Sequence, residues 1–517
     1  MTVDELWRPD DYPWTYEMHN SIAPINIGQK SSQMGYTETA LNVTLFKMDI
    51  EGLSCLYILP TKTPDASEFS AARFDSALEL SPHLVNMFSN VKNVGHKRAG
   101  SANLYIRGSN SRSSLKSIPV SFIVFDEVDE MNQENIPLAE ERTAGQADPQ
   151  MWKISTPTVP GMGINVEFEN STQEHYVFKC FHCSKRTELI WPDSVVITAE
   201  HQNDPKIKDT YLICKECKGV LPHETKRDWL GIDNAGWVPF GNPNLVARGF
   251  YVNQFYSIKR KPSDIAILYF KSLIDKASEQ EFFNSKLGKP HIVEGSKIEE
   301  HEINEAIARG KRVCSDSIPE NRIITMGVDH GRWLNWWIDA WEFPTLGNDL
   351  NMIAHCRTLA IGKCVDFSEL DTLMKQYQVL SCVIDAQPDR RLAYEFACRF
   401  WGHVKLCFYG KSQQAKTISI DPSDDQHKIT VDRTSWLDVA LNRFHIGTID
   451  LPTDTPTEAI DQLQNLIKRY DKDTRGNPTS MYINIGADHS AHARCYSEIA
   501  LPLGASIHTN QNVRIYL

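Results

Sequence analysis

The stretch Lys30-Ser-Ser-Gln-Met-Gly-Tyr-Thr37 decides the fold of the first part of this chain. The usual phosphate-binding loop reads Gly-x-x-x-x-Gly-Lys-Ser/Thr between a strand and a helix, and its backbone N–H groups hold phosphates. Gly35 and Thr37 occupy the places of the second glycine and the Mg²⁺-binding hydroxyl, whereas Lys30 and Tyr36 replace the first glycine and the lysine. A lysine at the front of the loop can fold its ammonium back to the β/γ-phosphates. The alternative is a serine-rich turn before a helix.

A second, acidic element supports a nucleotide site. Ser121–Phe125 is an apolar run typical of a buried strand, and Asp126 and Glu127 follow it directly. An Asp at such a strand end can hold Mg²⁺ through water, and the next Glu can activate the attacking water. Another strand ends near Thr156, whose hydroxyl we expect beside the phosphates. The alternative is a strand followed by an acidic, solvated loop that includes Asp129.

The composition is that of an ordinary globular protein. The chain has 517 residues, of which 41% are hydrophobic and 23% charged. No apolar run approaches the roughly 20 residues that span a bilayer, so we expect no membrane association and a place in the cytoplasm. The net charge of −12 argues against a uniformly basic surface, but it permits a local basic channel for nucleic acid.

Strand and helix patterns predict an α/β fold with four segments. We expect residues 1–165 to form an α/β core around the phosphate loop, which would be an ATPase core, 166–245 a cysteine-bearing insert, 246–318 a helical hinge or linker, and 319–517 a second α/β domain. Expected strands are Ser54–Leu59, Leu104–Arg107, Ser121–Phe125, Met151–Ser155, Ile323–Val328, Leu334–Glu342, Asn351–Arg357 and Leu380–Ile384. Expected helices are Glu38–Met48, Phe69–Leu80, Pro262–Ile274, Glu281–Leu287, Phe367–Tyr377, Arg390–Phe400, Ser435–Phe444 and Thr457–Arg469, with a linker at Ile318–Asn321.

Two Cys-x-x-Cys pairs predict a structural zinc site. Cys180 and Cys183 form the first pair, and Cys214 and Cys217 form the second after a spacer of 30 residues. Four thiolates at this spacing suit tetrahedral Zn²⁺. The alternatives are a redox pair and unmetallated cysteines. A closed four-cysteine site leaves no open position for catalysis, so its role is to fold the insert or to present a surface to DNA or a partner.

Carboxylates in the last 200 residues predict a second site. Asp329 and Asp385 each end a strand, and Asp488 precedes a helix that also carries His492. Acidic residues at neighbouring strand ends, with one on a late helix, can hold two divalent cations ~4 Å apart, which cleave a phosphodiester. Asp488 and His492 are four residues apart and share a helix face. The alternative for Asp488 is a helix N-cap.

Taken together, these motifs resemble the large terminase subunit of tailed bacteriophages. The resemblance extends over nearly the whole chain and is nearest to the lambda-like, GpA-type branch, in which the loop lysine is also displaced forward. It implies a P-loop ATPase domain and an RNase H-like nuclease domain, to which the cysteines add a small zinc-ribbon-like insert. By this resemblance Asp329 and Asp385 are the core nuclease ligands. His492 stands where many relatives carry a second Asp, so either Asp488 or His492 is the third ligand, or the second metal is bound weakly.

The same resemblance implies a function and its partners. The protein would use ATP to translocate viral double-stranded DNA into the procapsid, and would cut that DNA with Mg²⁺ or Mn²⁺. Expected partners are the small terminase subunit, the portal protein and further copies in a ring, in the host cytoplasm. Two alternatives remain open. One is a DNA-binding assembly protein with degenerate ATPase and nuclease folds, which Tyr36 supports; the other is a host helicase or repair nuclease.

Overall fold

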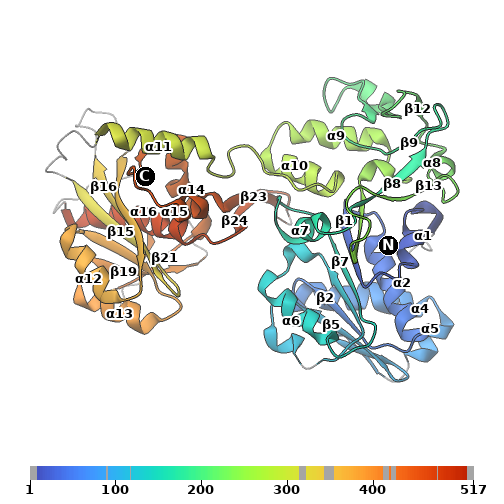
Figure 1. Cartoon of the computed structure of the whole chain (residues 1–517), viewed down its shortest axis with the longest axis horizontal. Coiled ribbons are helices and arrows are strands. Elements are labelled where there is room, and N and C mark those ends of the chain that lie inside the picture. The colour runs from blue at the N-terminus through green and yellow to red at the C-terminus, as the bar shows by residue number, and fades with distance from the viewer. Residues whose placement is uncertain are drawn as a thin grey trace. The chain divides into compact units, whose positions relative to one another are not determined.

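The computed structural model divides the chain into two compact units (Figure 1). Unit 1 comprises Met1–Val293 with Asp471–Pro478, and unit 2 comprises Glu294–Tyr470 with Thr479–Leu517. The structure describes residues 9–88, 91–116, 118–313, 322–342, 354–410, 418–420, 427–473 and 475–508. Both units combine helices with β-sheets, which confirms the predicted α/β class. The expected linker at Ile318–Asn321 lies outside the described residues.

Unit 1 is built on an eleven-stranded sheet. Its strand order is β13-β8-β14-β1-β7-β6-β2-β5-β4-β3, and β9 pairs with β8. The strands are β1 (Ile25–Lys30), β2 (Cys55–Leu59), β3 (Val91–Asn93), β4 (His96–Ala99), β5 (Ala102–Gly108), β6 (Phe122–Asp126), β7 (Gln150–Ser155), β8 (Glu174–Lys179), β9 (Arg186–Thr187), β13 (Ala235–Pro239) and β14 (Ala247–Val252).

Short helices surround this sheet, and α2 is the longest helix of unit 1. The helices are α1 (Thr15–His19), α2 (Tyr36–Asp49), α3 (Ser67–Phe69), α4 (Ser76–Glu79), α5 (Pro82–Met87), α6 (Ile136–Glu140), α7 (Gly163–Glu169), α8 (Lys226–Trp229), α9 (Pro262–Ser272) and α10 (Lys276–Glu281). All five residues of β6 are buried, as its apolar sequence predicts, and β1 runs parallel to β7 and β14. The carboxyl ends of β1 and β6 therefore reach the same edge of the sheet.

The cysteine segment is smaller than predicted. β8, β13 and β14 belong to the central sheet, so what stands apart from it is the stretch between β8 and β13. That stretch contains a three-stranded sheet of β10 (Val195–Val196), β11 (Tyr211–Ile213) and β12 (Val220–Leu221). β14 lies where a hinge was expected, because its apolar residues complete the sheet beside β1. The two units divide at Val293.

Unit 2 is built on an eight-stranded sheet in the order β20-β21-β19-β18-β15-β16-β17-β22. Its strands are β15 (Ile323–His330), β16 (Leu334–Glu342), β17 (His355–Cys364), β18 (Ser381–Asp385), β19 (Val404–Tyr409), β20 (Ile418–Ser419), β21 (Lys428–Val431) and β22 (Ile449–Asp450). The helices are α11 (Glu300–Val313), α12 (Phe367–Gln376), α13 (Arg390–Arg399), α14 (Arg433–His445), α15 (Thr457–Gln464) and α16 (His489–His508). A further pair of strands is β23 (Leu466–Lys472) and β24 (Pro478–Asn484).

Two expectations for unit 2 differ from the structure. The helix expected over Thr457–Arg469 ends at Gln464, because the following residues form β23 against β24. The strand expected at Asn351–Arg357 begins at His355 within the described residues and continues to Cys364. Within the described part of the chain, every helix is too short or too polar to traverse a bilayer.

Candidate functional site

The phosphate loop joins β1 to α2 at the carboxyl edge of the first sheet. Gly35 caps α2 with a left-handed φ of +82°, and a Cβ there would lie 3.0 Å from the ring of Tyr12. Gln33 also has a positive φ, +62°. The first N–H groups of α2 have no partner within the helix, and such groups bind anions. The local backbone therefore has the form of an anion-binding loop.

Residues far along the chain hold this loop in place. The N–H of Ser31 donates to the carbonyl of Val252 at 3.2 Å, and the N–H of Ser32 donates to the carbonyl of Ser285 at 2.8 Å. The indole of Trp14 donates to the carbonyl of Met34 at 2.8 Å. These three hydrogen bonds hold the loop in its conformation without a bound nucleotide.

Lys30 lies at the front of the loop and points to Glu127. The Lys30 side chain is only 7% exposed, and its Nζ lies 2.8 Å from Glu127 Oε1. Burial would lower the pKa of Lys30, but the neighbouring charges of Glu127 and Asp126 outweigh it and raise that pKa. The lysine is therefore charged, as a phosphate ligand must be. Glu127 itself has a left-handed φ of +64°, which is a strained conformation often found at functional sites.

Asp126 lies between two hydroxyl groups. Its Oδ1 accepts from Thr37 Oγ1 at 3.3 Å, and its Oδ2 accepts from the Tyr57 hydroxyl at 2.8 Å. Burial, together with the charge of Glu127, raises the pKa of Asp126 to about 6. A loop hydroxyl and a strand-end Asp are the groups that hold Mg²⁺ in phosphate-loop ATPases. Thr37 and Asp126 fit that ion by their chemistry and by their proximity.

Tyr36, which stands in the place of the usual lysine, points into the core of unit 1. Its side chain is 1% exposed and packs in the core, where a Cβ on Gly28 would lie 2.6 Å from the Tyr36 ring. Among the described residues its hydroxyl has no hydrogen-bond partner. The tyrosine side chain therefore takes the place of the lysine in the sequence, but it lies in the core, and the cationic side chain of this loop is that of Lys30.

Asp129 fastens the segment beyond Glu127 to the turn that follows β7. Its carboxylate accepts from the N–H and the hydroxyl of Thr158, each at 2.8 Å, and from the N–H of Ile164 at 2.7 Å. Burial raises the pKa of Asp129 to about 6. The alternative of a solvated acidic loop is therefore wrong for Asp129. Thr156, in the same turn, is half-buried.

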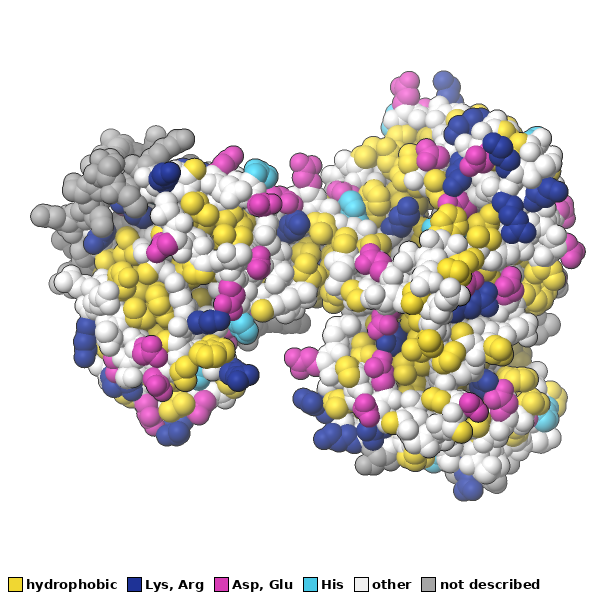
Figure 2. Space-filling view, in the orientation of Figure 1, with side chains coloured by type: hydrophobic (Ala, Val, Ile, Leu, Met, Phe, Trp, Pro, Cys, Tyr) yellow, Lys and Arg dark blue, Asp and Glu magenta, His cyan; other side chains and the backbone are white. Residues whose placement is uncertain are grey.

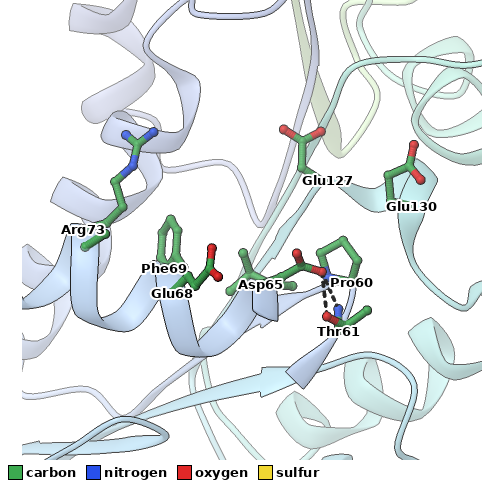
Figure 3. A pocket seen from close by; sticks show the side chains of 10 residues that line it. Pro60, Thr61, Asp65, Glu68, Phe69, Arg73, Glu127 and Glu130 are labelled. Carbon is green, nitrogen blue, oxygen red and sulfur yellow. Dashed lines mark hydrogen bonds between the residues drawn. The ribbon is translucent and has the colours of Figure 1, made fainter. Parts of the chain in front are cut away.

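A cavity of about 600 Å³ opens beside Glu127 (Figure 3). In Figure 3, Glu127 lies on one side of the group of lining residues, and the helical segment that carries Phe69 and Arg73 lies on another. Arg73 forms an ion pair with Glu38, which lies in the first turn of α2. The candidate catalytic carboxylate therefore borders open space that a substrate or a neighbouring molecule can enter.

The four cysteines come together as predicted. Their sulfur atoms all lie within 4.8 Å of one another, and the sulfurs of Cys180 and Cys217 are 3.9 Å apart. Burial would raise the pKa of Cys214, but the N–H groups of Cys217 and Glu216 outweigh it and lower that pKa to about 7. The donor set and its spacing fit a tetrahedral zinc ion.

In unit 2, Asp385 is the last residue of β18, and Asp329 is the last but one of the neighbouring parallel strand β15. β15 and β18 pair so that Val328 lies opposite Ile384, which places the two aspartates at adjacent positions of one sheet edge. Burial and then the charge of Asp329 raise the pKa of Asp385, while the Tyr496 hydroxyl bonds to its carboxylate. The two carboxylates are thus close enough to repel each other. A bound cation would reduce this repulsion.

Helix α16 brings histidines to this edge. It packs closely against β15 at Gly327. A Cβ at this position would lie 1.9 Å from the carbonyl oxygen of Ala493, so only a glycine permits this approach. The Nδ1 of His489 lies 2.8 Å from Asp329 Oδ2. His489 was not among the predicted site residues, although it is the residue next to Asp488.

Asp488 and His492 are tied to each other. Nε2 of His492 lies 3.4 Å from Asp488 Oδ2 and 3.3 Å from the guanidinium of Arg433, and Nδ1 lies 2.9 Å from the Tyr409 hydroxyl. Burial would raise the pKa of Asp488, but His492 and Arg433 outweigh it and lower that pKa. Among the described residues, the cysteines form the one group of three or more potential ligands within 4.8 Å, so Asp329, Asp385 and Asp488 are not gathered that closely.

Comparison with known families identifies the first half of the chain. Residues 3–237 match the family "Phage terminase large subunit gpA, ATPase domain". This part of the chain is therefore similar to the ATPase domain of phage large terminases. The predicted resemblance to large terminases is thereby confirmed, and the lambda-like branch stays a prediction. No curated protein matches the sequence.

The whole chain is also similar to solved structures, at low identity. The match to the HK97 bacteriophage large terminase covers 97% of this chain and 95% of that one, with 10% identity and a TM-score of 0.47. The match to the large terminase of a thermophilic bacteriophage covers 96% and 100%, with 10% identity and a TM-score of 0.33. The match to the large terminase nuclease of thermophilic phage G20c, with bound magnesium, covers 36% and 84%, with 14% identity and a TM-score of 0.22.

Several residues around the two carboxylate sites could not be found from sequence. In unit 1, Tyr57 places a hydroxyl group within the buried strand β2. This polar group in an apolar strand was the one feature of the sequence that could have indicated a role for Tyr57. In unit 2, Tyr409, Arg433 and Tyr496 lie on three different elements, and their contacts depend on packing between those elements.

Proposed function

We propose that the whole chain works as a large terminase subunit, an ATP-driven motor that moves viral double-stranded DNA into a procapsid and cuts it. The observation that carries this proposal is the junction of Lys30, Glu127, Asp126 and Thr37 in a terminase ATPase domain. In that junction a buried cation, a strained carboxylate and a hydroxyl–carboxylate pair meet where α2 begins. The assembly-protein alternative is less favoured, because Lys30 supplies the charge that Tyr36 lacks.

Each residue of the ATPase site has a proposed role. Lys30 binds the β- and γ-phosphates of ATP, and Thr37 and Asp126 hold Mg²⁺, which neutralises the charge on the phosphates. Glu127 orients and deprotonates the attacking water once Lys30 has turned to the nucleotide. The N–H groups of Gly35 and Tyr36 bind phosphate oxygens, and Thr156 lies on the turn from which it can sense the γ-phosphate.

The nuclease is proposed for the edge of the second sheet. Asp329 and Asp385 hold divalent cations, which supply the activated water and stabilise the leaving oxygen of the phosphodiester. Asp488 is the third ligand in this proposal, because His492 is already engaged by Arg433 and Tyr409. His492 then positions the Asp488 carboxylate, and His489 holds that of Asp329.

The cysteines and the partners complete the proposal. Cys180, Cys183, Cys214 and Cys217 hold one structural Zn²⁺ that folds their lobe. The motor acts as a ring of several copies, receives DNA through a small terminase subunit, and docks on the portal protein in the host cytoplasm. The similarity of residues 3–237 to terminase ATPase domains supports this choice of partners.

One pair of assays tests the proposed function. The purified chain should hydrolyse ATP faster when duplex DNA is added, and it should cleave plasmid DNA when Mn²⁺ or Mg²⁺ is added. Lys30→Ala should abolish the first activity and retain the second. Absence of DNA-stimulated hydrolysis, together with an unaltered rate in Lys30→Ala, would favour the assembly-protein function.

A further inference from the structure

Exposed basic side chains surround the two cysteine knuckles of unit 1. Lys179, Lys185 and Arg186 flank the first knuckle, and Lys218 follows the last cysteine of the second; all four are exposed. Figure 2 shows Lys and Arg side chains gathered over the part of unit 1 that carries β9, β12 and α8 in Figure 1. On a chain with a net charge of −12, such a local excess of positive charge is a distinct feature.

Two of these basic residues lie directly opposite each other. Lys179 on β8 pairs with Arg186 on β9 in antiparallel register, so their side chains leave the same face of the hairpin. Like charges in that position destabilise a hairpin. Neither residue forms an ion pair with any other residue that the structure describes, and the same holds for Lys185 and Lys218. The repulsion within this pair is therefore left for an external anion to relieve.

The two knuckles that carry these charges are in contact with each other. Nε2 of His182 lies 2.8 Å from the carbonyl oxygen of Val220, which ties the first knuckle to the second. Ser184 and Lys218 take equivalent left-handed conformations, each with a φ of +60°, four residues after Cys180 and Cys214. A Cβ on Gly219 would lie 2.5 Å from the His182 ring, so the two turns are in contact.

We propose that this knuckle face, defined as Lys179, Lys185, Arg186 and Lys218, binds the phosphate backbone of duplex DNA. The inference rests on the proposed function, which makes DNA the polyanion that the chain handles. Lysine and arginine contacts to phosphates carry no sequence information, as a motor that moves along DNA requires. Phe181, which follows the first cysteine of the first knuckle, is 53% exposed and is available to contact a sugar of the DNA.

A second explanation for the charges is local compensation. Four thiolates around one Zn²⁺ leave a net charge of about −2, which nearby lysines can balance. In that case removal of the charges would weaken zinc binding and leave DNA binding unaltered. The two explanations therefore predict different losses.

The test uses the full zinc-loaded chain and a fluorescein-labelled 40-base-pair duplex, with binding followed by anisotropy across a series of salt concentrations. In Lys179→Gln/Arg186→Gln we expect roughly tenfold weaker binding, and the slope of log K against log salt should fall by about 2, since each phosphate contact contributes about 0.9. The matched control is Lys206→Gln/Lys208→Gln, which removes the same charge from exposed lysines of the same lobe. Zinc content shows that both variants are folded, and Lys179→Arg/Arg186→Lys should restore wild-type binding.

Three outcomes would overturn the inference. Binding unaltered in the first variant, equal losses in both variants, or lost zinc with DNA affinity retained would each do so. If the wild-type chain binds no duplex and DNA does not stimulate its ATPase, the proposed function falls with the inference. If stimulation persists while the knuckle variant binds normally, only the inference falls.

Discussion

Lys30 and Glu127 form an ion pair across the phosphate loop, with Nζ 2.8 Å from Oε1. The pair joins the group proposed to bind phosphate to the group proposed to activate water. While it persists, neither group is free for its role. ATP must therefore draw the lysine away, which makes release of Glu127 depend on the nucleotide.

This coupling predicts different defects for the two partners. Glu127→Gln should retain ATP binding but lose about 10²–10⁴-fold in the rate of hydrolysis, because the base is gone while the lysine remains. Lys30→Ala should lose nucleotide affinity as well. Fluorescent-nucleotide titration and phosphate release separate the two. Equal affinity in both variants would contradict the coupling, and Glu134→Ala, an exposed neighbour, is the control.

The raised pKa of Asp126 predicts a pH dependence of nucleotide binding. Because that pKa is about 6, the carboxylate takes up a proton as the pH falls below 6 and loses its ability to hold Mg²⁺. Affinity for Mg²⁺-nucleotide should then fall by up to about tenfold per pH unit. Calorimetric titrations between pH 5 and 8 measure this. Asp126→Asn should bind weakly at every pH, and a flat wild-type profile would contradict the prediction.

Protonation of Asp126 should weaken nucleotide binding, but it should raise the free energy of unfolding of the chain without nucleotide. A raised carboxyl pKa means that the folded chain holds its proton more tightly than the unfolded chain, whose value is near 3.8. Asp126 and Asp129 should therefore add to the free energy of unfolding as the pH falls from about 6 to about 4. Urea denaturation of the full chain without nucleotide, in the wild type and in Asp126→Asn, tests this. The free energy of unfolding should depend more steeply on pH in the wild type than in the variant.

Asp129→Ala should destabilise the ATPase domain by about 2–4 kcal/mol, because it leaves three buried donors without an acceptor. The donors are two groups of Thr158 and the N–H of Ile164. Chemical denaturation measures the loss, and Glu134→Ala should cost less than about 0.5 kcal/mol. A loss no larger than that of this control would mean that the three bonds do not stabilise the turn.

Cys214→Ser should remove bound zinc. We expect about one zinc ion per wild-type chain and none in the variant, with a lower unfolding temperature, because a structural zinc site contributes its binding energy to folding. Elemental analysis and calorimetry measure the two effects. Cys398→Ser changes an exposed cysteine of α13 and is the control. Equal zinc content in both variants would exclude the four-cysteine site.

Asp385→Asn should abolish metal-dependent plasmid cleavage and leave the ATPase unaltered, because the two sites lie in separate units. Gel electrophoresis of nicked and linear plasmid measures the first activity. Asp454→Asn removes the charge of an exposed aspartate in the same unit and should have no effect. Normal cleavage by the Asp385 variant would show that the nuclease site does not lie at this edge of the sheet.

Local patterns predicted much of the fold, and they failed where distant contacts decide the structure. β16 has the predicted bounds, and β6 follows from its apolar run. β1 was not predicted, because Asn26 and Gln29 are buried there by strands and loops far along the chain. Lys30, Thr37 and Asp126 carry a local motif, whereas Tyr57 and Tyr496 join their sites only through packing.

The bonds from Ser31 to Val252 and from Ser32 to Ser285 also bear on how the protein is made. The phosphate loop lies near the beginning of the chain, yet its backbone is completed by residues more than 200 positions later. During synthesis the loop cannot reach its final form until Ser285 has left the ribosome. A nascent chain that ends before this point should therefore fail to bind nucleotide, even though it already contains every residue of the motif.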